Sequence, residues 1–202
     1  MPFPLFVLVS SAIAAPTVAA TLLLARRPQL AVLAALAGAT GLLLFHGPAY
    51  FDYYADDAYI TLRYSRHLAD GLGPDWNATG HVEGYTSFSW MALLAAMAKL
   101  GFDLVFAARL LATLAMVATF GILYRIWRLW ADDEPESGID HPLVLAAALL
   151  ALALSDAVPF WGFSGMETPL FMALLTTSAY LYLRERRTGA SPGLPSRSLP
   201  PP

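Results

Sequence analysis

The sequence predicts an all-α membrane protein that crosses the bilayer several times. Three observations support this: hydrophobic residues make up 57% of the 202 residues, charged residues make up 13%, and several uninterrupted apolar stretches recur along the chain. Soluble domains carry roughly 25% charged residues, so this composition argues strongly against a soluble enzyme. A helix that crosses the hydrocarbon core needs about 20 mostly apolar residues. The apolar stretches approach that length.

We expect about five membrane spans. Four stretches, residues 3–25, 29–45, 104–124 and 142–160, are long and apolar, and residues 169–183 form a shorter fifth. The first stretch also resembles a secretory signal, because small residues follow its apolar run. No basic residues precede it, however, which favours a span.

Basic residues predict how these spans are oriented, because Lys and Arg near span ends are retained in the cytoplasm. Three clusters contain seven of the twelve basic residues: Arg26, Arg27, Arg125, Arg128, Arg184, Arg186 and Arg187. All seven reach the cytoplasm only if residues 85–101 lie along the outer membrane surface instead of crossing it. We therefore predict a multi-pass protein of the cell membrane with residues 47–103 and 161–167 outside the cytoplasm.

The net charge and the lack of cysteine exclude several classes of partner and site. A net charge of −3 without a basic run disfavours nucleic acid as a partner, and the lack of cysteine excludes thiol catalysis and Cys-ligated metal sites. Residues 1–187 then form one transmembrane domain, and residues 188–202 form a Pro-rich tail that we expect to be disordered.

The first outer loop gathers most of the polar residues that could carry chemistry. Between residues 47 and 83 the sequence has six acidic residues and only two arginines. The acidic residues are Asp52, Asp56, Asp57, Asp70, Asp75 and Glu83, and the arginines are Arg63 and Arg66. Residues 58–70 have helical spacing of apolar positions and end at Gly71, and residues 90–100 form a second apolar helix. We expect both helices to lie at the membrane interface.

The adjacent Asp56 and Asp57 are the leading site candidates. One of them could cap the following helix while the other is solvated. Alternatively, the pair supplies a general base for a sugar hydroxyl, or one base beside a ligand for a divalent metal such as Mg²⁺ or Mn²⁺, with Asp57 as the ligand. Arg63 shares a helix face with Asp56 and would meet either a phosphate or a carboxylate.

Two further acids lie near span ends. Glu83 either caps the second outer helix or lines the cavity of the aspartate pair, and Tyr85 is a residue type common at interfaces. Glu167 lies in the second outer turn, where it could cap the helix that begins at Pro169.

Four segments together resemble a known family. These are Asp56-Asp57-Ala58-Tyr59-Ile60-Thr61-Leu62-Arg63-Tyr64, Leu68-Ala69-Asp70-Gly71-Leu72-Gly73, Val82-Glu83-Gly84-Tyr85-Thr86-Ser87-Phe88-Ser89-Trp90, and Ser164-Gly165-Met166-Glu167-Thr168-Pro169-Leu170-Phe171. They resemble the outer-loop motifs of the GT-C membrane glycosyltransferases that use polyprenyl-phosphate sugars, most closely the terminal arabinofuranosyltransferases of mycobacterial-type cell walls. Family members are several hundred residues long, so the chain would correspond to their N-terminal part, as a truncated or partial enzyme.

The resemblance implies a role for each candidate. Asp56 would be the catalytic base, Asp57 would orient it or bind a metal, and Arg63, Glu83, Tyr85 and Glu167 would bind substrate. The donor would be a polyprenyl-phosphate sugar such as arabinofuranose, and the acceptor would be a cell-envelope glycan. The alternative function is a non-catalytic membrane protein that assists assembly or binds lipid. Transport is disfavoured, because ionisable residues gather at span ends, with Arg109 and Asp156 the nearest exceptions.

Overall fold

The computed structural model describes residues 3–77, 80, 82–133 and 137–188, and within these ranges the chain forms helices and no strand. The elements follow in the order α1 (Phe3–Leu23), α2 (Pro28–His46), the 3-10 helix η1 (Gly47–Tyr50), α3 (Asp56–Ala69), α4 (Phe88–Lys99), α5 (Leu104–Asp133), α6 (Pro142–Leu154), α7 (Ala157–Phe163) and α8 (Thr168–Thr188). Thr188, the first residue of the expected tail, is instead the last residue of α8, and residues 189–202 lie outside the described part.

The described helices confirm a membrane protein. Three segments are long and apolar enough to cross a bilayer: α1, α2 continued by η1, and α5. A fourth span results if α6 and α7 are counted together. The first three agree with the predicted stretches at residues 3–25, 29–45 and 104–124, although α5 continues to Asp133.

The predicted span at residues 142–160 is not one straight helix. It divides at Ser155, whose backbone is extended, and α6 and α7 meet at an angle of 56°. Pro159 provides the physical reason. In a continuous helix its ring would clash with the carbonyl of Ser155 and it would donate no hydrogen bond, whereas in the first turn of α7 neither penalty arises.

The fifth predicted span, residues 169–183, is helical as part of α8, but α8 is not among the helices apolar enough to cross a membrane. Its hydroxyl residues lower the hydropathy. Thr176, Thr177 and Ser178 each donate a hydrogen bond to the carbonyl four residues earlier. The expected count of five spans is therefore not confirmed.

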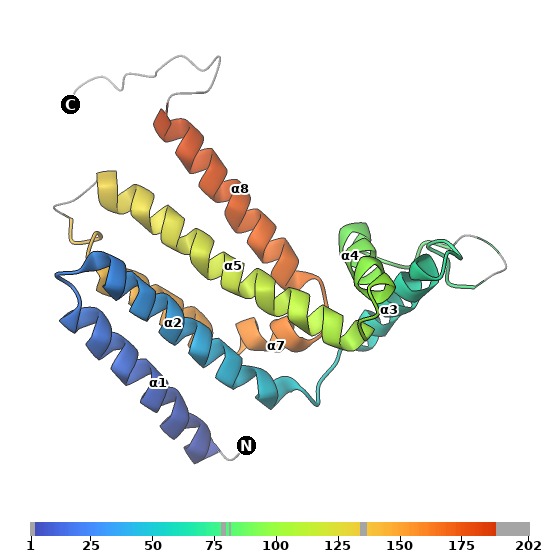
Figure 1. Ribbon diagram of the computed structural model, residues 1–202, viewed down its shortest axis with the longest axis horizontal. Helices are drawn as coiled ribbons and strands as arrows, with labels where there is room; N and C mark the ends of the chain where they lie inside the picture. Colours follow the sequence, from blue (N-terminus) through green and yellow to red (C-terminus); the bar gives the residue numbers. More distant parts are fainter. Residues whose placement is uncertain (1–2, 78–79, 81, 134–136, 189–202) are drawn as a thin grey trace.

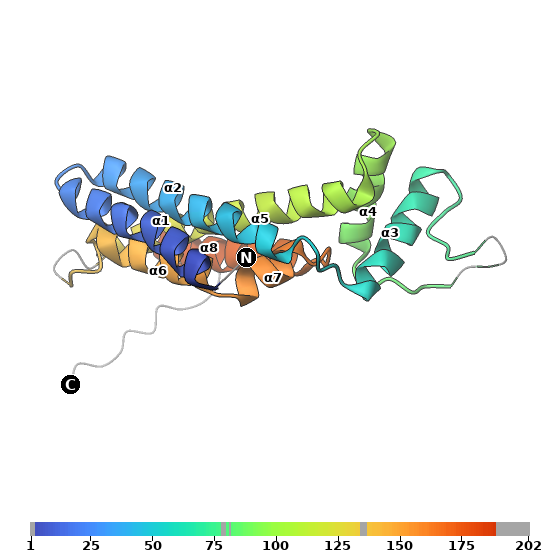
Figure 2. The ribbon, with the colours of Figure 1, turned by 90° about the horizontal axis from the view of Figure 1, so that it is seen from below.

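The long helices form an elongated bundle with two distinct ends (Figures 1 and 2). At one end, Arg187 forms ion pairs with Asp133 at 2.9 Å and Asp132 at 3.7 Å, which join the last turns of α5 and α8. The turn between α1 and α2, with Arg26 and Arg27, lies at this same end (Figure 1). The three basic clusters therefore share one end, as the orientation requires; the side of the membrane stays a prediction.

The opposite end carries α3 and α4, which pack on each other beside the start of α5 (Figure 2). Leu62, Trp90 and Leu94 join the first turns of α5 in a separate apolar cluster. The Ser65 hydroxyl, which is fully buried, donates to the Met91 carbonyl and ties the two helices together. Gly71 follows the helix with φ of 80°, the left-handed conformation expected for a residue that ends α3.

This arrangement predicts the outcome of thiol labelling, because the chain has no cysteine of its own. In intact cells, an impermeant maleimide should label Asp57→Cys at the α3 end but should label Asp140→Cys, which precedes α6, only after permeabilisation. Equal labelling of both positions before permeabilisation would contradict the orientation.

Candidate functional site

The acid pair forms the first turn of α3. Ala55 occupies the N-cap position without a side-chain hydrogen bond, so neither aspartate caps the helix in the way that the capping interpretation required. Asp56 and Asp57 are exposed, and both lie next to the free N–H groups of the first turn, where negative charge is favoured. Both carboxylates are therefore available to a ligand from outside.

The entry into α3 is fixed by the turn that precedes α8. The Ala55 N–H donates to the Ser164 carbonyl at 2.9 Å. The ring of Tyr54 lies directly over Gly165, where an added Cβ would come within 2.2 Å of the tyrosine Cζ. Gly165 also has φ of 89°, which disfavours any other residue. The position of the acid pair thus depends on residues more than 100 positions later.

Tyr54 is itself buried at this junction. Burial raises the pKa of its phenol well above the usual value, so the hydroxyl keeps its proton at neutral pH. The hydroxyl oxygen has no hydrogen-bond partner among the described residues. Its ring contacts the ring of Tyr59 at a centroid distance of 4.9 Å, on the first turns of α3.

The segment that starts α4 meets the same turn. Trp90 is fully buried, and its indole Nε1 donates to the Gly165 carbonyl at 3.1 Å. The Thr86 hydroxyl donates to Glu167 Oε1 at 2.9 Å. These contacts join residues 75 and 81 positions apart. Three of the four segments that carry the family resemblance therefore meet at one junction.

Arg63 contacts the loop after α3, whereas a phosphate or a carboxylate was expected as its partner. Its Nε donates to the Trp76 carbonyl at 3.0 Å, its Nη2 donates to Asn77 Oδ1 at 3.1 Å, and the guanidinium lies 4.5 Å from the centroid of the Trp76 ring. The described residues contain no ion pair with Arg63, so the salt-bridge alternative is not what the structure shows. Arg63 holds the loop after α3 against that helix.

Glu83 and Tyr85 lie on the loop before α4. Glu83 is exposed, and Tyr85 is half-buried with its ring edge-on to Tyr64 at 5.2 Å. The Tyr64 hydroxyl donates to the Val82 carbonyl at 2.6 Å, and Gly84 allows this approach because an added Cβ would lie 2.7 Å from that hydroxyl. Tyr64 thus anchors this loop to α3.

Two cavities flank the junction. One, of about 400 Å³, lies between the start of α4 and the start of α8 and is lined by polar side chains together with an apolar wall. Its polar residues are Thr86, Ser87, Ser89, Glu167 and Thr168, and Leu170, Phe171 and Leu174 form the apolar part. Hydroxyls beside one carboxylate can exchange hydrogen bonds with a polyhydroxylated ligand.

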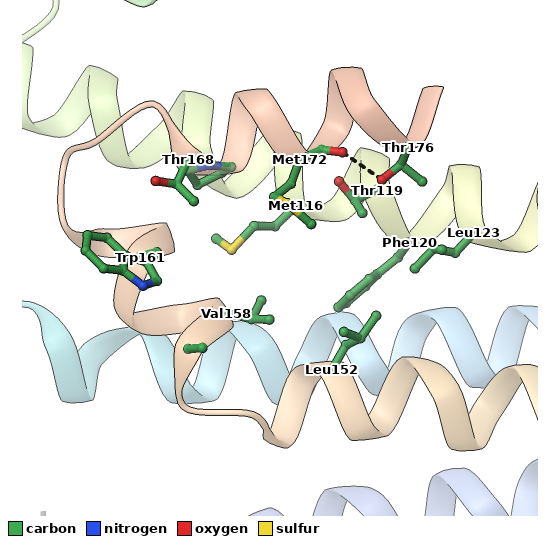
Figure 3. A pocket seen from close by; sticks show the side chains of 12 residues that line it. Met116, Thr119, Phe120, Leu123, Leu152, Val158, Trp161, Thr168, Met172 and Thr176 are labelled. Carbon is green, nitrogen blue, oxygen red and sulfur yellow. Dashed lines mark hydrogen bonds between the residues drawn. The ribbon is translucent and has the colours of Figure 1, made fainter. Parts of the chain in front are cut away.

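The second cavity, of about 370 Å³, is almost wholly apolar and lies between α5, α7 and α8 (Figure 3). Met116, Phe120, Trp161 and Met172 point into it (Figure 3). Thr168, the first residue of α8, lines both cavities. The linings of the polar and the apolar cavity therefore share one residue, Thr168.

Of the predicted site residues, only Glu167 lines either cavity. Asp56 and Asp57 are linked to the junction through the Ala55 backbone, whereas Arg63, Glu83 and Tyr85 lie along the loops around α3. Thr86 and Thr168 line the polar cavity but are not among the predicted site residues, although both fall within the quoted motifs. Arg109 was noted only as an ionisable residue close to a span interior.

Two carboxylates could hold a metal ion. Carboxylate oxygens suit Mg²⁺ and Mn²⁺, and Asp56 and Asp57 provide two such groups. Across the described ranges, no three His, Asp or Glu side chains gather. Because Mg²⁺ is often bound by one or two carboxylates together with water and phosphate oxygens, the metal stays a prediction.

Comparisons with protein families, with curated proteins and with solved structures give no match to this chain. The resemblance to the GT-C glycosyltransferases therefore stays a prediction from the motifs.

The close approach at Gly165 predicts a stability effect. Gly165→Ala would force Tyr54 aside and strain a backbone with positive φ, so we expect a loss of about 1–3 kcal/mol in unfolding free energy. Denaturation of the detergent-solubilised protein measures it. Gly121→Ala is the matched control, because nothing lies within 4 Å of that Cβ position on α5; an equal loss in both variants would contradict the packing.

Proposed function

We propose that the chain takes part in glycosyl transfer from a polyprenyl-phosphate-linked sugar to a cell-envelope glycan acceptor at the outer face of the membrane. One observation carries this proposal: the segments that resemble the family's first and second outer motifs meet through the Thr86–Glu167 and Trp90–Gly165 hydrogen bonds. Nothing in their sequence spacing required this contact. Motifs that serve one site are expected to converge in this way.

The paired cavities support an amphipathic donor. A lipid-linked sugar has an apolar tail and a polyhydroxylated head, joined by a phosphate. The cavity between α5, α7 and α8 suits the first part of the tail, and the cavity lined by Glu167 suits the sugar. The phosphate would then lie near Thr168, which lines both cavities. In this proposal the donor is an arabinofuranosyl lipid, as the resemblance implies.

The proposed mechanism uses Asp56 as the base. Its carboxylate removes the proton of an acceptor hydroxyl, and the oxygen attacks the anomeric carbon of the donor. The bond between that carbon and the phosphate oxygen breaks, and the lipid phosphate leaves with the bonding electrons. Asp57 orients the base, and exposure of both carboxylates lets a large glycan acceptor approach from outside.

The acceptor and donor contacts are proposed for the remaining predicted residues. Glu167 and the neighbouring hydroxyls accept and donate hydrogen bonds to sugar hydroxyls. Glu83 and Tyr85 lie on the exposed loop before α4, where they would contact the acceptor. Arg63 supports the loop on which Trp76 and Asn77 lie and supplies positive charge beside α3.

A second function, a non-catalytic protein that binds lipid or assists assembly, is favoured by one observation. Asp56 and Asp57 line neither cavity, whereas the apolar cavity alone suffices to hold an acyl chain. The two functions differ in whether the acid pair is needed, which substitution tests directly.

Replacement of the base distinguishes these functions. In membranes that contain the chain, Asp56→Asn should reduce transfer from a radiolabelled polyprenyl-phosphate arabinofuranose to a glycan fragment by about 10²–10⁴-fold, because a general base contributes that much. Asp70→Asn, at the other end of α3, is the matched control and should retain transfer. Undiminished transfer in Asp56→Asn would remove this residue from the mechanism.

Glu167 should affect binding more than turnover. Glu167→Gln keeps an oxygen that accepts from Thr86 but loses the charge, so KM for the donor should rise about tenfold while kcat changes little. Steady-state kinetics over a range of donor concentrations measures both constants. An unchanged KM would place the sugar outside the cavity that Glu167 lines.

A further inference from the structure

Arg109 is an arginine in the first turns of an otherwise apolar span. It is only partly exposed, and its Nη2 donates to the Phe51 carbonyl at 2.6 Å. The guanidinium carbon lies 4.8 Å from the centroid of the Phe51 ring and 5.6 Å from that of Tyr54. A cation held over aromatic rings in a partly desolvated place is attracted by both. Arg109 therefore joins α5 to the segment that leads into α3.

The usual explanation for an arginine in a membrane helix is an ion pair with a carboxylate. No such pair involves Arg109 within the described residues, and its Nε is buried without a hydrogen-bond partner there. Its specific interactions are instead with one backbone carbonyl and two rings, all contributed by residues 51–54. Leaving a buried donor unpaired is unfavourable, so this placement has a structural cost that the contacts to this segment must offset.

The segment from Phe51 to Ala55 is held on its other sides by the α7 region. The rings of Tyr53 and Phe160 stack at 4.6 Å, and the Ala55 N–H donates to the Ser164 carbonyl. Between these contacts, the Tyr54 ring lies against Gly165. The segment is therefore clamped between α5 on one side and the turn after α7 on the other, immediately before Asp56.

We propose that Arg109 is a positioning residue that sets the place and orientation of the acid pair at the start of α3. It acts through the Phe51 carbonyl and the rings of Phe51 and Tyr54, and it does not itself contact the acceptor. Its consequence for catalysis rests on the function proposed above, whereas its effect on the geometry of α3 does not. The two can therefore be tested separately.

The geometric part is tested by distance measurements between spin labels, since the chain has no native cysteine. Labels at Asp57→Cys on α3 and Leu181→Cys on the exposed face of α8 should show a narrow distance distribution. Arg109→Met should broaden or shift it, and Arg109→Lys should restore part of the order, because an ammonium can still reach the carbonyl. An unchanged distribution in Arg109→Met would overturn the proposal.

Arg125→Met is the matched control. Arg125 lies on the same helix and also combines a hydrogen bond with a ring contact, both to Tyr180, but at the opposite end of the bundle. Its replacement should leave the distribution unchanged; an equal change in both variants would overturn the specific role of Arg109. If Arg109→Met does not fold, Tyr54→Leu removes one of the two rings, and an unchanged distribution in that variant would overturn the proposal.

Kinetics then separates positioning from direct contact with substrate. In unlabelled protein, Arg109→Met should lower kcat by about 100-fold with KM unchanged, as expected for a misplaced base. A rise in KM without a change in the label distances would show that Arg109 binds substrate and overturn the positioning role. A broadened distribution in Arg109→Met, together with no transfer by the unsubstituted protein, would support the positioning of α3 while refuting the proposed function.

Discussion

The end of the molecule that carries α3 and α4 depends on one turn, Ser164–Gly165. The Ser164 carbonyl accepts from Ala55, and the Gly165 carbonyl accepts from the buried indole of Trp90. The close approach of Tyr54 and the positive φ of Gly165 require a residue without a side chain at this position. This turn therefore joins the start of α3 and the start of α4 to the chain before α8.

The turn lies where it does because the chain bends before it. Pro159 is compatible with the first turn of a new helix but not with the continuation of α6, so α7 departs from α6 at 56°. The apolar cavity lies between α5, α7 and α8, with Thr168 in its lining (Figure 3). Thr168 lines the polar cavity as well. The bend before α7 thus contributes to the wall of the apolar cavity.

Much of the fold follows from the sequence, because span length, basic clusters and helix-ending residues are local signals. They locate α1, α2, α3 and α4 to within a few residues, and they locate the start of α5 but not its end at Asp133. The bend at Ser155 was missed, because an average over an apolar stretch does not register Pro159. The acid pair was found by its local pattern, but the Thr86–Glu167 contact was not, because no periodicity relates residues 81 positions apart.

The segments before α4 and before α8 form one site if Thr86 and Glu167 are in contact, and a short bifunctional thiol cross-linker tests this most directly. In native membranes, Thr86→Cys combined with Glu167→Cys should be cross-linked within one chain in high yield. Thr86→Cys combined with Asp140→Cys, at opposite ends of the bundle, should not (Figure 1). Absence of the first cross-link, with both thiols shown to be reactive, would contradict the account.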